Sequence, residues 1–256
     1  MERPTKGSAV RPSPLRRGLP HSPLLHKTLL AVLEQNGKLV SYTTLAAALG
    51  VAVPTAVRRV EELEREGHVL LLDAFPDEAV KNRLRKPRIY VREAAAQALS
   101  PRPSLGPINE LIETEKRLHP SSDLFHSTNR GGRGLDVIVD RGSFRFGVMH
   151  VPVGVPRRRR LTPLRRAREQ GLIRRGFALH GGTDAFFLYA DAFAVPRMVF
   201  LGAYADWTAR RLEPHVLIHW CNNASVTNLG SGEPTIRIHI PEVRKKLPFY
   251  AVPSRE

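Results

Sequence analysis

Residues 42–67, YTTLAAALGVAVPTAVRRVEELEREG, most narrowly limit the folds open to this chain. The second half has apolar residues at steps of four, three and three, which place them in one stripe of an α-helix. These residues are Val53, Val57, Val60 and Leu63. A smaller stripe before them consists of Leu45, Ala48 and Leu49. Gly50 suits the left-handed residue that ends a helix, and Pro54 suits the first turn of the next. The pattern predicts a helix-turn-helix.

Polar residues on and before the second helix define a candidate DNA-reading surface. Thr55, Arg58 and Arg59 lie opposite the apolar stripe, so they would face a duplex. Ser41 is placed to cap the preceding helix, which begins near Thr43. We expect all five of these residues to contact DNA. Helical hairpins without DNA contacts have Leu, Gly and Pro at similar spacings, so that alternative stays open.

A basic hairpin is expected directly after the second helix. Residues 68–72, HVLLL, and 88–91, RIYV, predict two paired strands. The segment 81–92 contains six basic residues and no acid. We expect five of them to bind DNA phosphates: Lys81, Arg83, Arg85, Lys86 and Arg88. A further helix is expected at residues 24–36, where Leu25, Leu29, Val32 and Leu33 form another apolar stripe. Three helices followed by such a hairpin indicate a winged helix, a module that can also serve protein contacts alone.

The charge of the whole chain points to a polyanionic partner. The 256 residues include 40 Lys+Arg and 24 Asp+Glu, for a net charge of +16. We expect double-stranded DNA as the partner, with RNA or protein subunits of a nucleoprotein complex as alternatives. No apolar run approaches the roughly 18–20 residues needed to span a bilayer. The single cysteine, Cys221, excludes an internal disulfide. We expect no membrane partner, no cofactor and a cytoplasmic, nucleoid-associated protein.

Breaker-rich segments divide the chain into five expected parts. Residues 1–20 are rich in arginine and proline and predict a disordered basic arm. Residues 21–99 form the expected winged-helix domain, and 100–107, SPRPSLGP, form a linker. Residues 108–197 predict a small α/β domain in which helices at 108–118 and 163–170 accompany short strands. Residues 198–256 form a C-terminal extension of unknown role.

Four segments together resemble part of a known family. They are LAAALGVAVPTAVRRVEELEREGHV, KPRIYVRE, GGRGLDVIVDRG and FALHGGTDAFFL. Residues 42–196 resemble the C-terminal half of a family of bacterial AAA+ ATPases, in which a winged helix precedes a PD-(D/E)XK nuclease-like domain. The chain has no GxxxxGK[ST] motif, so ATP hydrolysis is not expected. The resemblance implies an α+β fold, an N-terminal winged helix followed by a degenerate nuclease-like domain.

The catalytic positions implied by this resemblance are incomplete. Asp136 stands where the first acid of a PD-(D/E)XK site belongs. On the following strand, His150 and Pro152 occupy the positions of the second acid and the lysine. One carboxylate with one imidazole makes a poor magnesium site. We therefore expect Asp136 to be a remnant, with no catalytic residue and no metal.

Two further groups of residues suggest ligand sites. Residues 157–175 contain nine arginines and one acid, Glu169. We expect a second basic surface that binds phosphate. It consists of Arg157, Arg158, Arg159, Arg160, Arg165, Arg166 and Arg168. A solvated helix face is the alternative. Histidines and Cys221 in 215–221 and His239 suggest a metal site, but the strand pattern favours ordinary half-buried residues.

Three functions are compatible with these features. The first is a sequence-specific, non-catalytic duplex-DNA-binding protein that regulates transcription. The second is a DNA- or RNA-binding structural or adaptor subunit of a larger nucleoprotein complex, in a mobile element or a defence system. The third, a metal-dependent nuclease, is disfavoured because the second acid and the lysine are missing.

Overall fold

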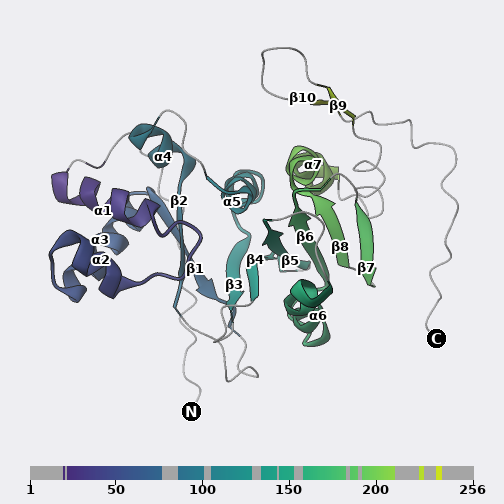
Figure 1. Ribbon diagram of the computed structural model, residues 1–256, viewed down its shortest axis with the longest axis horizontal. Helices are drawn as coiled ribbons and strands as arrows, with labels where there is room; N and C mark the ends of the chain where they lie inside the picture. The colour runs from purple at the N-terminus through teal and green to yellow at the C-terminus, as the bar shows by residue number, and fades with distance from the viewer. Residues whose placement is uncertain are drawn as a thin grey trace, which may run out of the picture.

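The chain is an α+β protein built on one mixed β-sheet (Figure 1). The computed structural model describes residues 20, 22–76, 86–100, 105–128, 134–142, 144–152, 158–182, 185–189, 192–210, 225–227 and 235–237. Within those residues, an eight-stranded sheet has the order β2-β1-β3-β4-β5-β6-β8-β7. No helix in the described part of the chain is both long enough and apolar enough to cross a membrane.

Three helices form the first part of the fold: α1 (Pro23–Leu33), α2 (Tyr42–Leu49) and α3 (Val53–Arg65). They share one core cluster to which each helix contributes fully buried side chains, among them Leu29, Leu45 and Val60. Gly50 adopts φ 66° between α2 and α3, and its N–H binds carbonyls of the last turn of α2. Both helices of the predicted pair are confirmed, with the left-handed turn at the expected glycine.

The buried stripes of these helices differ from the predicted ones. The buried residues of α3 are Ala56, Val60 and Leu63, whereas Val53 is 41% exposed. In α2, Leu45 and Ala46 are buried, and Ala48 is exposed. Ala56 faces the interior because it lies four residues before Val60, on the same side of the helix. The first turn of α3 is therefore an exposed surface.

An antiparallel hairpin follows α3 and is part of the main sheet. Its strands are β1 (Val69–Ala74) and β2 (Arg88–Val91), and the bounds of β2 match the predicted strand. The end of β1 pairs in parallel with β3 (Asp123–Thr128), through Asp73 with Phe125 and Ala74 with His126. The expected linker at 100–107 therefore does not interrupt the sheet, although its residues 101–104 lie outside the described part.

The remaining elements complete two helical layers around the sheet. They are α4 (Glu93–Leu99), α5 (Pro107–Leu118), β4 (Gly134–Asp140), β5 (Arg145–Val151), a 3₁₀ turn η1 (Arg158–Leu161), α6 (Thr162–Glu169), β6 (Arg175–His180), β7 (Phe186–Tyr189), β8 (Ala192–Pro196) and α7 (Arg197–Arg210). Helices α5 and α7 share a core with one face of the sheet, and α6 packs on the opposite face (Figure 1). Neither α4 nor β8 was predicted.

A small two-stranded sheet lies in the C-terminal extension. It pairs β9 (Ser225–Thr227) with β10 (Thr235–Arg237) in antiparallel fashion. The predicted strand at 215–221 and the expected basic arm at 1–19 lie outside the described residues.

Candidate functional site

The first half of α3 offers exposed polar and apolar side chains together. Val53, Pro54 and Arg58 are exposed, and Thr55 is half-buried. Arg59 differs, because its Nη1 donates to Glu62 Oε2 at 2.6 Å within the helix. Of the two arginines expected to read DNA, Arg58 is therefore the one with the more accessible side chain.

Ser41 acts as the N-cap of α2. Its Oγ accepts a hydrogen bond from the backbone N–H of Thr44 at 3.4 Å, as predicted from its position. Ser41 Oγ also lies 2.7 Å from Thr44 Oγ1, and Thr43 beside it is exposed. The hydroxyl of Ser41 thus has a structural task within the helix, alongside the DNA contact expected of it.

Only part of the segment between β1 and β2 belongs to the described residues. Lys81, Arg83 and Arg85 lie outside the described residues, and Lys86 is exposed two residues before β2 begins. The carbonyl of Lys86 accepts a hydrogen bond from His126 Nε2 at 2.9 Å. This bond fixes the end of the segment to β3.

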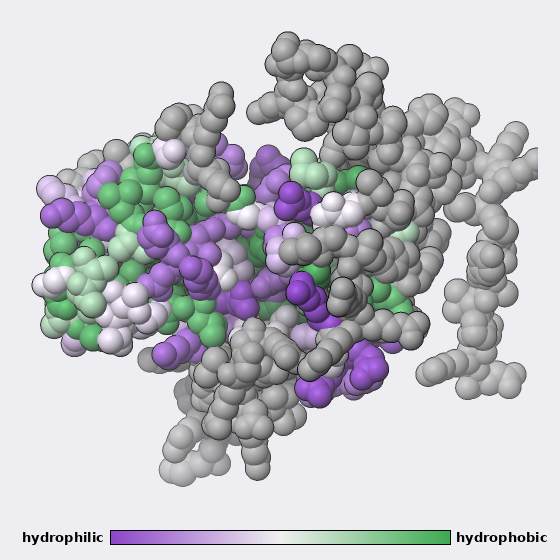
Figure 2. All heavy atoms as spheres, in the orientation of Figure 1, coloured by the Kyte–Doolittle hydropathy of each residue, from purple (hydrophilic) through white to green (hydrophobic). Residues whose placement is uncertain are grey.

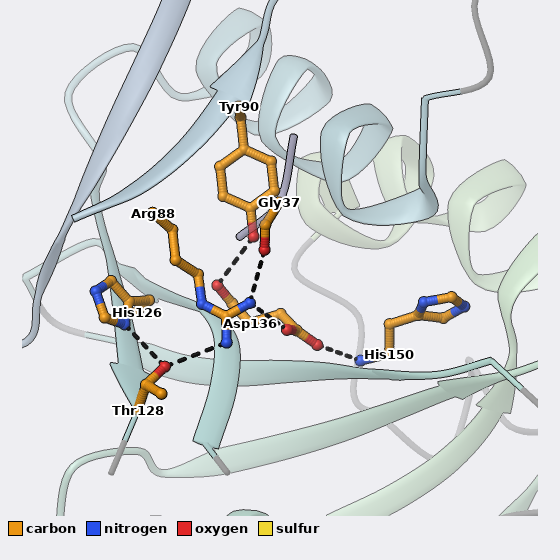
Figure 3. Close-up of polar contacts among 7 residues, drawn as sticks. All are labelled: Gly37, Arg88, Tyr90, His126, Thr128, Asp136 and His150. Atoms are coloured by element: carbon orange, nitrogen blue, oxygen red, sulfur yellow. Dashed lines mark hydrogen bonds and ion pairs between the residues drawn. The ribbon is translucent and has the colours of Figure 1, made fainter. Parts of the chain in front are cut away.

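Arg88 departs from the expected arrangement, because its guanidinium faces the protein. Its Nη1 donates to Gly37 O and to Asp136 Oδ1, both at 2.9 Å, and its Nη2 donates to Thr128 Oγ1 at 3.2 Å (Figure 3). The side chains of Arg88 and Asp136 are 13% and 23% exposed. The expectation that Arg88 binds DNA phosphate is corrected, since internal acceptors already hold its charge.

The hydrogen bonds around Arg88 continue through β3. His126 Nδ1 lies 3.1 Å from Thr128 Oγ1, and the opposite ring nitrogen donates to the Lys86 carbonyl. In the neutral imidazole the second nitrogen is an acceptor, so the Thr128 hydroxyl donates to it. Guanidinium, hydroxyl and imidazole therefore form one chain between β2 and β3.

Asp136 occupies the point where β4 and β5 stop pairing. The last pair in their register is Val137 with Val148, and beyond it Asp136 Oδ2 accepts the backbone N–H of His150 at 2.6 Å. The Tyr90 hydroxyl donates to the Asp136 carbonyl at 3.4 Å. Burial raises the pKa of Tyr90, and the nearby Asp136 raises it further, so this phenol stays protonated.

A divalent metal does not fit at Asp136. One carboxylate oxygen binds Arg88 and the other binds a backbone N–H. The imidazole of His150 points away from the carboxylate, and Pro152 has no ligand atom in its side chain (Figure 3). Within the described part of the chain, no three His, Cys, Asp or Glu residues are grouped as metal ligands. The guanidinium of Arg88 supplies the positive charge at this position.

Two other carboxylates on α5 and β4 have partners of their own. Glu113 binds Arg92 at 2.5 Å, and Asp140 binds Arg145 at 2.8 Å. Glu110 is exposed on α5. None of these three carboxylates completes a site at Asp136.

The second basic surface is partly described. Arg160, Arg165 and Arg166 are exposed, Arg168 is half-buried, and Arg157 lies outside the described residues. Arg158 and Arg159 belong to η1. Leu164 and Ala167 bury the opposite side of α6 against the sheet.

Sequence patterns missed a buried ionic cluster that links α5 to α7. Arg141 Nε and Nη2 donate to the two carboxylate oxygens of Glu115 at 2.8 and 2.5 Å, and the Tyr204 hydroxyl donates to Glu115 Oε2 at 2.7 Å. Glu115 is fully buried. The position of Glu115 on the apolar face of an amphipathic helix could have predicted its burial. Its partners could not be predicted, because they are distant in sequence.

Comparison with known proteins adds no relative. The chain matches no family profile and no curated protein sequence.

Proposed function

We propose that this protein binds duplex DNA sequence-specifically, does not catalyse a reaction and regulates transcription. The observation that carries the proposal is the exposed first half of α3, where Val53 and Arg58 face outward directly after the Gly50 turn. Such a helix fits the major groove, where N-terminal residues of the second helix of a helix-turn-helix contact base edges. The three helices and the β1–β2 hairpin support a winged-helix interpretation.

Each exposed group has a distinct expected task. The Arg58 guanidinium can donate two hydrogen bonds to guanine, and the Val53 side chain can contact a thymine methyl group. Lys86 and the basic residues before it would bind flanking phosphates and add affinity without sequence preference. Arg88 has no such task, since it holds the base of the hairpin to Asp136.

Substitution of Arg58 tests this assignment. Arg58→Ala should reduce the preference for the bound site over a scrambled duplex by about 10-fold or more, because a good bidentate contact contributes about 1–3 kcal/mol of discrimination. Fluorescence anisotropy with both duplexes measures the ratio. Arg65→Ala is the matched control, since Arg65 is an exposed arginine in the last turn of the same helix. An unchanged ratio in Arg58→Ala would remove α3 as the reading helix.

The nuclease-like part is proposed to be a degenerate, non-catalytic domain. The divergence of β4 and β5 at Asp136 supports the likeness, and the Arg88 ion pair supports the loss of metal-dependent chemistry. We expect no cleavage of plasmid or linear duplex with magnesium or manganese. Manganese-dependent nicking by the purified protein that disappears in Asp136→Ala would contradict this proposal.

A further inference from the structure

Helix α6 and the turn after it carry an arginine-rich outer surface. Arg165 and Arg166 are exposed on the helix, while Leu164 and Ala167 bury its other side. Arg160 precedes the helix and Arg174 follows the turn at Gly171, and both are exposed. We call Arg160, Arg165, Arg166 and Arg174 the α6 surface. Figure 2 shows hydrophilic residues gathered over α6.

Little negative charge opposes this surface. Glu169 is the one acid between residues 158 and 182. It lies 3.5 Å from Arg165, and the two side chains are 61% and 62% exposed, so water screens their attraction. Asp140, at the end of β4, already binds Arg145. Among the described residues, the four arginines of the α6 surface are therefore opposed by one exposed carboxylate, that of Glu169.

The chemistry of these side chains identifies a class of ligand. Arginine presents planar pairs of N–H donors that match the oxygens of a phosphate group. Among the described residues, the exposed large apolar side chains are Leu30, Val53, Leu118 and Met198, and none of them belongs to η1, α6 or the turn that follows, so burial of an apolar partner has no support here. A chain of phosphates is the ligand that fits best.

We propose that the α6 surface binds the sugar-phosphate backbone of a nucleic acid without reading its sequence. The inference deepens the proposed function, on which it rests for DNA as the ligand. Binding at α6 adds affinity and salt dependence, whereas α3 supplies site preference. The two contributions are separable, because each phosphate contact changes the salt dependence by a similar amount on any sequence.

The test removes two charges from the α6 surface and compares a matched control. The slope of the logarithm of the binding constant against the logarithm of salt concentration is negative. Its magnitude should decrease by about two in Arg160→Gln/Arg166→Gln, equally on a selected and a scrambled duplex. Lys27→Gln/Arg117→Gln removes the same charge from exposed positions on α1 and α5, and its slope should change less. Circular dichroism and thermal unfolding verify that both variants fold.

The outcomes separate this inference from the proposed function. A slope in the α6 variant equal to that of the wild type, or equal to that of the control, overturns the inference and leaves α3 unaffected. A site preference that stays unchanged in Arg58→Ala overturns the α3 assignment and leaves the α6 inference unaffected. A parallel titration with single-stranded RNA of equal length distinguishes the two sources of backbone. A slope change on RNA alone assigns RNA to the α6 surface.

Discussion

The guanidinium of Arg88 bonds to three residues from different elements, and Asp136 is the only one of them that carries a charge. Such an arrangement stabilises the fold only while both charges are present, because each alone would be partly buried without compensation. The pair gives Asp136 a structural role between β2 and β4. Its effect is measurable as stability.

Asp136→Asn should lower the free energy of unfolding by about 2 kcal/mol, since the charged hydrogen bond to Arg88 is lost. Urea denaturation followed by circular dichroism measures the change. Glu34→Gln, which alters an exposed carboxylate after α1, serves as the control. In a double-mutant cycle, Arg88→Gln and Asp136→Asn should be strongly non-additive. Simple additivity of the two losses would mean that the pair contributes nothing.

The imidazole of His150 should make stability depend on pH. Burial lowers its pKa below the usual 6.5; the Asp136 charge opposes this shift, and Arg197 adds to it. The folded protein therefore favours the neutral ring, while the unfolded chain binds a proton as the pH falls through about 6.5. Stability is lost from that pH downward.

His150→Gln should flatten this part of the pH profile. The variant should lose less free energy of unfolding than the wild type between pH 7 and pH 5. His119 also has a pKa lowered by burial and by Arg141. His119→Gln should therefore remove a separate part of the stability loss between pH 7 and pH 5. Urea titrations at several pH values provide the comparison. Superimposable profiles of the wild type and His150→Gln would exclude His150 as a cause.

At the scale of elements, the start of α2 combines a cap with an expected DNA contact. Ser41→Ala should cost about 1 kcal/mol of stability, because the Thr44 N–H loses its side-chain acceptor. Ser41→Asp should keep the cap and add a negative charge. If Ser41 contacts a phosphate, Ser41→Asp should weaken DNA binding without changing stability. Anisotropy measures the binding, and thermal unfolding measures the stability. Equal DNA affinity in both variants would leave Ser41 with the cap alone.

Helix α7 depends on the buried cluster around Glu115. Burial would raise the Glu115 pKa, but hydrogen bonds from Arg141 and Tyr204 together bring it below the usual value, so the carboxylate stays charged at neutral pH. Glu115→Gln should cost about 3 kcal/mol, because it leaves the Arg141 charge without its partner. Glu169→Gln, in the exposed pair on α6, should change stability by less than about 1 kcal/mol. Equal effects in a denaturation series would contradict this ranking.

Helices and strands with a clear periodicity of apolar residues were predictable from the sequence, and those without it were not. The strand β2 has the predicted bounds, and α3 differs only in which residues face the core. Helix α4, EAAAQAL, has too little contrast between its faces to mark a helix against the linker. Strand β8 is buried at every position, so it shows no alternation.

At the scale of the whole molecule, the sheet joins the two expected domains. Leu72 of β1 and Tyr90 of β2 lie in the same core cluster as residues of β4, β5 and α7. The pairing of β1 with β3 and the Arg88–Asp136 bond cross the same junction. Local patterns could not reveal these contacts, because Arg88 and Asp136 are 48 residues apart. The three N-terminal helices and the α6 surface therefore belong to one fold built on a continuous sheet.

Sequence-specific binding through α3 is tested most directly by selecting bound duplexes from a random library, with the wild type and Arg58→Ala/Arg59→Ala in parallel. We expect one recurring motif for the wild type, and loss or alteration of that motif in the variant, which should still fold. Both proteins should still bind duplex at low salt, because phosphate contacts do not depend on sequence. Absence of an enriched motif from the wild type, or the same motif from both proteins, would contradict sequence-specific binding through α3.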